Sequence, residues 1–170
     1  NSNFNQEVHE AFMDLAVGTG VMLVEEGDSI QPVKFTAVPL PRVYLNSGPD
    51  GRIDSIYRVR QCKASDINLL YPKAKVPEDL LKRTKKLNII EAVYKDYDES
   101  NTEKHQLCVF LENPKIILLE ETYKGIGSNP YLIFRWNKAS GEVYGRGPIF
   151  NAMAAIKTCN LTIELILENA

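Results

Sequence analysis

The amino-acid sequence predicts an α+β fold made mainly of antiparallel β-strands, with an N-terminal helix, short middle helices and a C-terminal helix. Three observations lead to this class. Both ends of the chain carry apolar residues at helical spacing, and the stretch between them holds short alternating segments separated by turn residues. The 170 residues are 44% apolar and 25% charged, which suits a single globular domain, residues 1–170, with its own hydrophobic core.

The first helix is predicted to begin after Asn3. Asn3 is suited to be its N-cap, and Gln6, three residues later, completes a capping box. An apolar face with a period of 3.6 follows, formed by Phe4, Val8, Ala11, Phe12 and Leu15. The GTG sequence at residues 18–20 ends this helix, and a strand begins directly after it.

Strands are predicted where apolar and β-branched residues run between turn signals. They cover residues 21–26, 33–38, 42–46, 52–61, 88–97, 104–112, 115–123 and 130–136. The SGPDG sequence at 47–51 predicts a tight hairpin turn, and DESNT at 98–102 predicts a second turn. Asn113-Pro114 separates two of the strands.

The middle of the chain also predicts two short helices and a loose connection. Ser65 is suited to cap a helix that ends before Pro72, and Pro77 is suited to open the helix PEDLLKRTKK. Gly125 and Gly127 lie between two predicted strands and indicate a flexible link.

The last helix is predicted to begin at Pro148 and to carry two apolar stripes separated by a narrow wedge of charges. One sheet beneath the helix buries only one stripe, so the other is expected to need another chain or another part of a longer chain. The alternative is a central helix buried within its own domain. The residues expected to pack between subunits are Ile149, Met153, Ile156, Leu161, Ile163, Leu165 and Leu167.

The titratable residues form no catalytic or metal-binding pattern. His9 and His105 have no second ligand at metal spacing, so both are expected at the solvated surface. The carboxylates of Glu25-Glu26, and likewise of Glu120-Glu121, point to opposite faces of a strand and cannot share a proton. No catalytic residue, cofactor or metal is therefore expected, and the chain is predicted not to be an enzyme.

Charge, hydropathy and cysteine content limit the classes of partner. A formal net charge of −2 argues against a surface built for tight binding of nucleic acid. No uninterrupted apolar run reaches ~18 residues, so neither a transmembrane helix nor a membrane partner is expected. Cys62, Cys108 and Cys159 are widely spaced, which predicts free thiols.

A glycine-rich stretch, RWNKASGEVYGRGP at residues 135–148, precedes the last helix. Such a turn is typical of phosphate sites, and Arg146 places a positive charge beside the amides. The Gly-Lys-Ser/Thr end of a P-loop is absent, however. The favoured interpretation is an elbow that aims the helix, with Gly145 and Gly147 allowing unusual backbone angles and Arg146 packing against a carboxylate or carbonyl.

Three stretches of the chain, residues 2–26, 38–61 and 129–160, carry motifs of a known family. They contain a helix ending in G-T-G before an acidic strand, a hairpin with G-x-[IV]-D, and P-x-x-x-x-R-W…G-E-x-Y-G-R-[GS]. Together they resemble the bacteriophage head-to-tail connecting (portal) proteins of short-tailed phages, although residues 73–124 match no motif. The signature residues are Gly18, Gly20, Arg135, Trp136, Gly141, Glu142, Tyr144, Gly145, Arg146, Gly147 and Pro148.

The resemblance implies a structural subunit of a dodecameric ring at one capsid vertex of the virion, assembled in the host cytoplasm. In that family double-stranded DNA passes through the ring without sequence-specific binding during packaging and ejection, and the ring docks terminase and then tail adaptor proteins. The chain would be a fragment of a longer portal-type subunit, corresponding to its wing-like body. The alternative is an adaptor or interaction module of another phage or prophage assembly, without portal activity.

Overall fold

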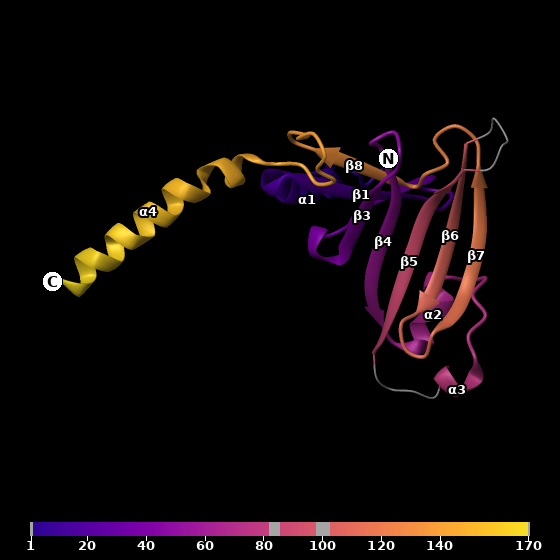
Figure 1. Cartoon of the computed structure of the whole chain (residues 1–170). Coiled ribbons are helices and arrows are strands. Elements are labelled where there is room, and N and C mark those ends of the chain that lie inside the picture. The colour runs from indigo at the N-terminus through magenta and orange to yellow at the C-terminus, as the bar shows by residue number, and fades with distance from the viewer. Residues whose placement is uncertain (1, 82–85, 98–102, 170) are drawn as a thin grey trace. The chain divides into compact units, whose positions relative to one another are not determined.

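The computed structural model describes residues 2–81, 86–97 and 103–169, and the predicted turn at 98–102 lies outside these ranges. The chain forms two compact units (Figure 1). The first unit combines residues 1–39 with residues 132–170, and the second contains residues 40–131. The sequence predicts a single domain, and the division into two compact units does not test whether the two units fold as one domain, so that expectation stays a prediction. The mixed α+β class with antiparallel strands is confirmed.

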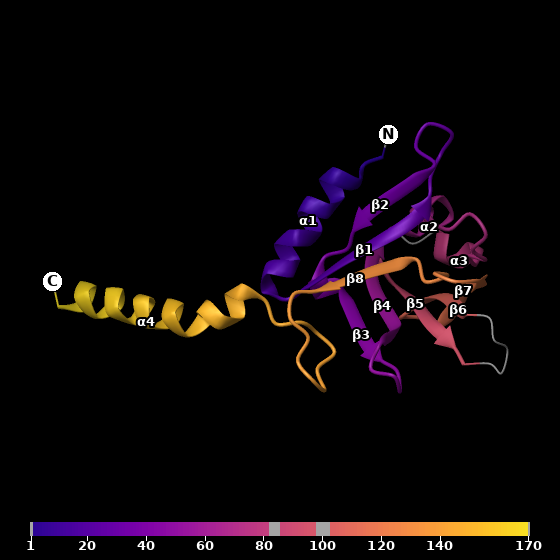
Figure 2. The same cartoon turned by 90° about the horizontal axis from the view of Figure 1, so that it is seen from above.

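The first unit contains a three-stranded sheet with the order β2-β1-β8. Strands β1 and β2 are antiparallel, with Met22 opposite Ala37 at one end and Glu26 opposite Val33 at the other. Figure 2 shows α1 running beside this sheet. The elements of the unit are α1 (Phe4–Val17), β1 (Thr19–Glu26), β2 (Val33–Ala37), β8 (Tyr131–Arg135), whose first residue belongs to the second unit, and α4 (Pro148–Glu168).

The predicted capping box at the start of α1 is wrong. Asn3 is the N-cap residue, but its side chain makes no capping bond. Its amide instead donates from Nδ2 to Phe35 O (2.7 Å) and accepts at Oδ1 from Phe35 N–H (3.0 Å). The Glu7 carboxylate likewise accepts the Ala37 N–H at 2.7 Å. These side chains occupy edge groups of β2 that would otherwise be available to another strand.

The apolar face of α1 is centred on Ala11, which is buried. Gly20 makes this approach possible, because a Cβ there would overlap the Ala11 carbonyl. Phe4 packs edge-on against Phe35 with ring centroids 5.0 Å apart. The prediction that Phe12 lies on the same face is wrong: its side chain is more than half exposed, because the helix turns it about 100° away from Ala11.

The second unit is a five-stranded antiparallel sheet with the order β3-β4-β5-β6-β7. The SGPDG turn is confirmed between β3 and β4, where Gly48 N–H donates to Arg52 O at 2.8 Å. Its elements are the 3-10 turn η1 (Leu40–Arg42), β3 (Val43–Ser47), β4 (Ile53–Cys62), α2 (Ala64–Leu70), α3 (Glu78–Leu81), β5 (Leu87–Asp96), β6 (Lys104–Leu111) and β7 (Ile116–Lys124).

Two local predictions in this unit need correction. Helix α2 begins at Ala64 with Lys63 as its N-cap, and the Ser65 hydroxyl donates to Asp66 Oδ1 instead of capping the helix. The link at Gly125 and Gly127 is a hydrogen-bonded turn and not a loose connection. The second middle helix is described over Glu78–Leu81, whereas residues 82–85 of the predicted segment lie outside the described ranges.

The core of the second unit lies on one face of its sheet. Alternate residues of the central strands are buried, as period-2 patterning requires, and α2 adds the buried Ala64 and Ile67. The opposite face is half exposed along β5 and β6. The buried strand residues include Ile56, Ile89, Val93, Leu107, Val109 and Leu111.

Candidate functional site

The glycine-rich stretch forms an elbow that is clasped to the end of α1 by backbone hydrogen bonds. Gly147 N–H donates to Val17 O at 2.9 Å, and Gly145 N–H donates to the Thr19 hydroxyl at 2.8 Å. Trp136 N–H donates to Gly18 O at 3.0 Å. Two motifs far apart in sequence, GTG and YGRGP, are therefore one structural feature, which we call the glycine clasp.

The prediction that Gly145 and Gly147 adopt unusual backbone angles is wrong, because neither has a positive φ. Glycine is needed in the clasp because the two backbones touch. A Cβ on Gly18 would overlap Gly145 O, and one on Gly145 would overlap Gly18 O. A Cβ on Gly147 would overlap Ala16 O and lie 2.7 Å from Ala16 C. Real Cβ atoms essentially never approach other heavy atoms within 3.0 Å, so a side chain at these positions would push the segments apart.

Charged side chains brace the elbow from outside. The Arg146 guanidinium donates from Nε to Glu142 Oε2 at 2.9 Å and from Nη2 to Glu142 Oε1. It also lies over the Phe150 ring, 5.1 Å from the centroid. The hydrogen bond from Arg146 lowers the pKa of the Glu142 carboxyl. Arg135 Nη1 donates to Val143 O at 3.3 Å, which ties β8 to the same turn.

The remaining signature residues shape the elbow. Gly141 adopts a φ of +80° where the chain turns, and Pro148 occupies the first turn of α4, as predicted. The Trp136 ring is about half exposed and the Tyr144 ring is also exposed. The sequence does not reveal that Gly18 and Gly145 meet, because nothing in a single chain reports which distant glycines approach each other.

The geometry of the elbow does not favour a phosphate cradle. The amides of Gly145 and Gly147 already have acceptors within the clasp, and the Arg146 guanidinium is paired with Glu142. An anion at the start of α4 would have to displace these intramolecular bonds.

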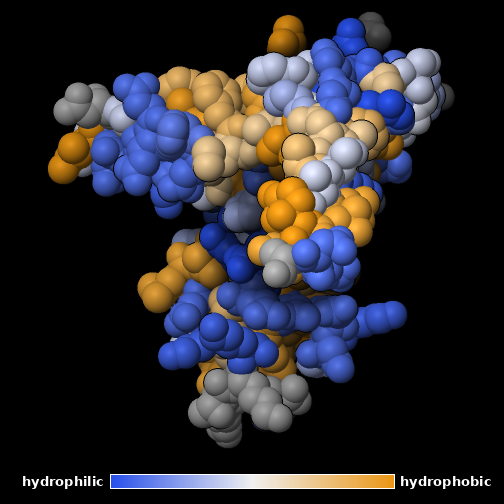
Figure 3. All heavy atoms as spheres, turned by 90° about the vertical axis from the view of Figure 1, so that its left-hand side faces the viewer, coloured by the Kyte–Doolittle hydropathy of each residue, from blue (hydrophilic) through white to orange (hydrophobic). Residues whose placement is uncertain are grey.

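Helix α4 follows the clasp and is exposed along its whole length. None of its 21 residues, all of which the structure describes, is buried. The expectation that one apolar stripe is covered by a sheet is therefore wrong, because α4 leaves the clasp without passing over either face of the sheet in its unit. In Figure 3, where α4 faces the viewer, apolar atoms lie on its exposed surface.

Two threonines of α4, and the asparagine that follows the helix, bond their side chains to carbonyls of the preceding turn. The Thr158 hydroxyl donates to Ala154 O at 3.0 Å, and the Thr162 hydroxyl donates to Thr158 O at 2.9 Å. Asn169 Nδ2 donates to Leu165 O at 2.7 Å. Side chains bonded in this way need no water, so these parts of the helix surface can be buried in an interface at little cost.

By length and mean hydropathy alone, α4 is able to cross a membrane. It has 21 residues, with a mean hydropathy of 1.2 over 18 of them. The expectation of no transmembrane helix considers only uninterrupted apolar runs, and it stays a prediction because length and mean hydropathy alone do not place a helix in a membrane. Lys157 and Glu164 interrupt the apolar run, but the mean hydropathy of the helix stays high enough for a membrane-spanning segment. Core helices of soluble proteins pass the same test.

Sequence reasoning missed a buried polar cluster in the second unit. The Glu91 carboxylate accepts the Tyr71 hydroxyl at 2.7 Å and also the Tyr131 hydroxyl. Arg58 lies opposite Glu91 in the β4–β5 register and is 7% exposed, and its Nη1 has no hydrogen-bond partner among the described residues. Burial, followed by the charge of Glu91, raises the pKa of both tyrosines, so they stay protonated and donate.

The sequence does contain a signal for this cluster. Both β4 and β5 carry a charged residue at a position whose side chain points into the core. Arg58 follows Ile56 by two residues, and Glu91 stands between Ile89 and Val93 at the same spacing. Period-2 alternation therefore places both charges in the core, where a buried charge needs polar partners.

The prediction for His105 is also wrong, whereas His9 is exposed as expected. His105 is 3% exposed, and its Nδ1 lies 2.8 Å from the Ser128 hydroxyl. Burial lowers its pKa. Within the described ranges no group of three or more His, Cys, Asp or Glu side chains is placed to hold a metal ion. Cys62, Cys108 and Cys159 are free thiols, as predicted.

Comparison with known proteins identifies the family. No curated protein matches the sequence. The sequence model of the bacteriophage head to tail connecting proteins matches residues 1–170, the whole chain. The resemblance carried by the G-T-G and R-W…G-E-x-Y-G-R motifs is thereby confirmed. The chain belongs to the bacteriophage head-to-tail connecting protein family, whose members are structural virion components that assemble with other phage head and tail proteins.

Proposed function

We propose that this chain is part of a subunit of the portal ring, the head-to-tail connector through which phage DNA is packaged and ejected. The subunit assembles with copies of itself into a dodecamer at one capsid vertex. The ring forms in the host cytoplasm and docks first terminase and then tail adaptor proteins. Its role is structural and needs no cofactor.

The exposure of α4 is the observation that carries this proposal. The helix is about 30 Å long at 1.5 Å per residue, and large apolar side chains follow both of its stripes. Exposed apolar surface of this extent marks an interaction site. In a ring each subunit has a neighbour on both sides, so a helix with two apolar stripes has a partner for each.

The glycine clasp supports the proposal because it holds the start of α4 to the end of α1. A helix that mediates assembly must leave its own unit in a defined direction, and preorganisation reduces the entropy lost on binding. The clasp supplies that direction through the hydrogen bond from Gly147 N–H to Val17 O and through the close contact of Gly18 with Gly145.

The polar residues of α4 favour a protein partner over a lipid one. Lys157 lies near the middle of the helix, where a charge in a bilayer core would cost about 3 kcal/mol or more. Lys157, Glu164 and Glu168 also share one narrow side of the helical wheel, as in a helix whose remaining surface is packed.

The charge balance fits a conduit for DNA. A wall rich in Lys and Arg would hold the phosphate backbone through counterion release, whereas a nearly neutral or acidic wall lets the duplex slide. The net charge of −2 agrees with passage without sequence-specific binding.

Electron microscopy of the full-length protein tests the proposal. Negative staining should show rings with a central hole. Ile163→Glu and Leu165→Glu, one change in each stripe, should reduce the fraction of protein in rings. Lys157→Gln, in the charged wedge, is the matched control and should leave ring formation unchanged.

A monodisperse monomer that never forms rings would contradict the portal assignment. Complexes of this monomer with another phage component would then favour the adaptor alternative.

A further inference from the structure

A turn directly after β7 presents one isoleucine to solvent. Gly125 to Ser128 form a four-residue turn closed by Ser128 N–H donating to Gly125 O at 3.1 Å. Gly125 and Gly127 have φ angles of +113° and +74°, and Ile126 between them is fully exposed. Single exposed apolar residues are common, so exposure alone carries no argument. The hydrogen bonds that hold the turn around Ile126 carry the argument instead.

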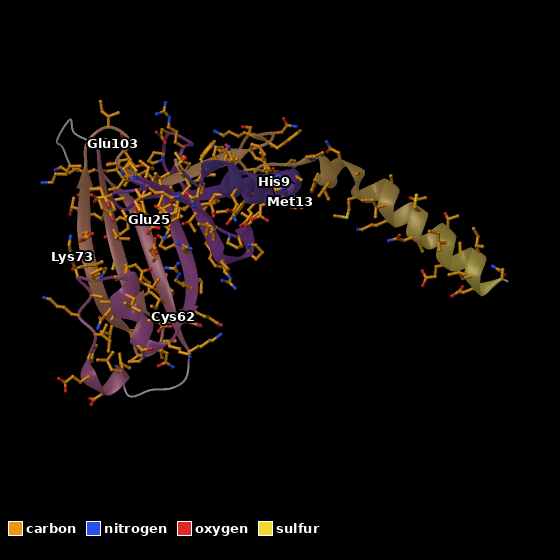
Figure 4. All side chains as sticks on the ribbon, turned by 180° about the vertical axis from the view of Figure 1, so that it is seen from behind. His9, Met13, Glu25, Cys62, Lys73 and Glu103 are labelled. Atoms are coloured by element: carbon orange, nitrogen blue, oxygen red, sulfur yellow. The ribbon has the colours of Figure 1, made fainter. Side chains whose placement is uncertain are left out.

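The turn is held by hydrogen bonds to Glu103, which directly precedes β6, and to His105 within β6. Gly125 N–H donates to Glu103 O at 2.9 Å, and Gly127 N–H donates to Glu103 Oε2 at 3.3 Å. The Ser128 hydroxyl is bonded to His105 Nδ1 at 2.8 Å. Figure 4 shows Glu103 at this end of the five-stranded sheet. Ile126 is therefore a preorganised apolar knob that would lose little entropy on binding.

The other end of the same strand carries an apolar cavity of about 470 Å³. Three cross-strand neighbours on the half-exposed face form its floor, with Ile90 opposite Phe110 and Phe110 opposite Ile117. The cavity is large enough to receive one branched aliphatic side chain. We call it the socket; it is lined by Ile90, Phe110, Glu112, Lys115, Ile116 and Ile117.

We infer that the Ile126 knob of one copy inserts into the socket of the next copy, so that copies of this chain join head to tail. The inference rests on the proposed ring and assigns one of its contacts. Ile126 and Ile117 are separated by most of β7, about 25 Å at ~3.3 Å per residue, so knob and socket of one rigid sheet cannot meet. A contact between two different patches repeats from copy to copy and closes into a ring when the rotation permits.

Charges at the two ends agree with this pairing. Lys124 precedes the knob and is exposed, and Glu112 is exposed at the rim of the socket. Asn88 Nδ2 donates to Glu112 Oε2 at 2.7 Å and holds that carboxylate in place. Glu103 beside the knob and Lys115 at the rim are a second opposite pair. Rim charges of this kind mainly fix register and partner choice.

Cysteine cross-linking of the full-length protein tests the contact. Ile126→Cys combined with Ile117→Cys, in a Cys159→Ser background, should give a ladder of dimers, trimers and larger species on oxidation. Either cysteine alone should stay monomeric on a non-reducing gel. Ile126→Cys with Tyr57→Cys, an exposed position on β4 outside the socket, is the matched control and should give no ladder.

Two substitutions give an independent measurement. Ile126→Lys should weaken association about tenfold or more, because a buried isoleucine is replaced by a charge. Lys124→Glu should also weaken association, and Glu112→Lys in the same chain should restore it.

The possible outcomes distinguish failure of the proposed knob-and-socket contact from failure of the proposed ring. Rings by electron microscopy without a ladder would overturn the knob-and-socket contact and leave the proposed function standing. Absence of both rings and ladder would overturn both. Oxidative dimers of Ile126→Cys alone would show a symmetric contact and contradict the head-to-tail arrangement.

Discussion

The substitution Gly147→Ala isolates the close contact in the glycine clasp. The φ of Gly147 is −89°, a value that any residue adopts, so alanine introduces no backbone strain. Its Cβ, however, would overlap Ala16 O and lie 2.5 Å from Val17 C. Both atoms belong to the backbone of the last turn of α1 and cannot turn aside as a flexible side chain would.

The expected cost follows from these contacts. Forcing one methyl group into a filled space costs about 1–3 kcal/mol. Separating the segments also weakens two hydrogen bonds, Gly147 N–H to Val17 O and Gly145 N–H to Thr19 Oγ1, at about 1 kcal/mol each. Alanine has fewer backbone conformations than glycine in the unfolded chain, which offsets about 0.5 kcal/mol of this loss. The first unit should therefore lose about 2.5–4.5 kcal/mol of unfolding free energy.

Urea unfolding followed by tryptophan fluorescence measures this loss. Trp136 is the single tryptophan, and its amide is bonded within the clasp, so the signal reports on the first unit. Gly141→Ala is the matched control. Gly141 has a φ of +80°, but no heavy atom lies within 4 Å of where its Cβ would stand, so only backbone strain of about 1 kcal/mol is expected. If Gly147→Ala costs no more than Gly141→Ala, the contact argument is refuted.

Three further outcomes are expected. Glu91→Ala should lower the unfolding free energy by about 2–6 kcal/mol in chemical denaturation, because the buried Tyr71 and Tyr131 hydroxyls both lose their acceptor. Burial lowers the pKa of His105 in the folded state. Neutral His105 therefore contributes its full stability above pH ~6.5, and this contribution is lost as the pH falls through the folded-state pKa. His105→Gln should flatten the dependence of the melting temperature on pH over that range. Asn3→Ala should cost about 1–2 kcal/mol and speed amide exchange at Phe35, because both hydrogen bonds to that edge residue are lost; unchanged exchange would contradict the assigned role.

The order and type of the elements could be predicted from the sequence because their signals are local. Turn residues such as SGPDG, the helix-stopping Gly18 and the helix-opening Pro148 act within a few residues, and the structure places element ends close to each of them. The distribution of apolar residues likewise identifies α4 as a helix with more apolar surface than one sheet covers.

The errors come from long-range partners that local rules do not include. Asn3 fits an N-cap by type, yet its amide is better used on Phe35, which has an unpaired edge donor and acceptor. Polarity without register places His105 at the surface, whereas its alternation with Leu107 and Val109 places it inside. Which glycines of the clasp meet is equally invisible in the sequence, since contact between residues 18 and 145 depends on the completed fold.

The clasp and the exposure of α4 are better understood together than separately. A helix with no buried residue is marginal in isolation, because helices of this length gain most of their stability from tertiary packing. A flexible linker before it would let the helix reach partners in many directions, each with its own entropy cost on binding. Three glycines that allow backbone contact, and Arg146 braced by Glu142, instead restrict the start of the helix before any partner arrives. Restricting a segment that its own unit does not bury is useful only if the covering surface approaches from a fixed direction, as a neighbouring subunit in a closed ring does.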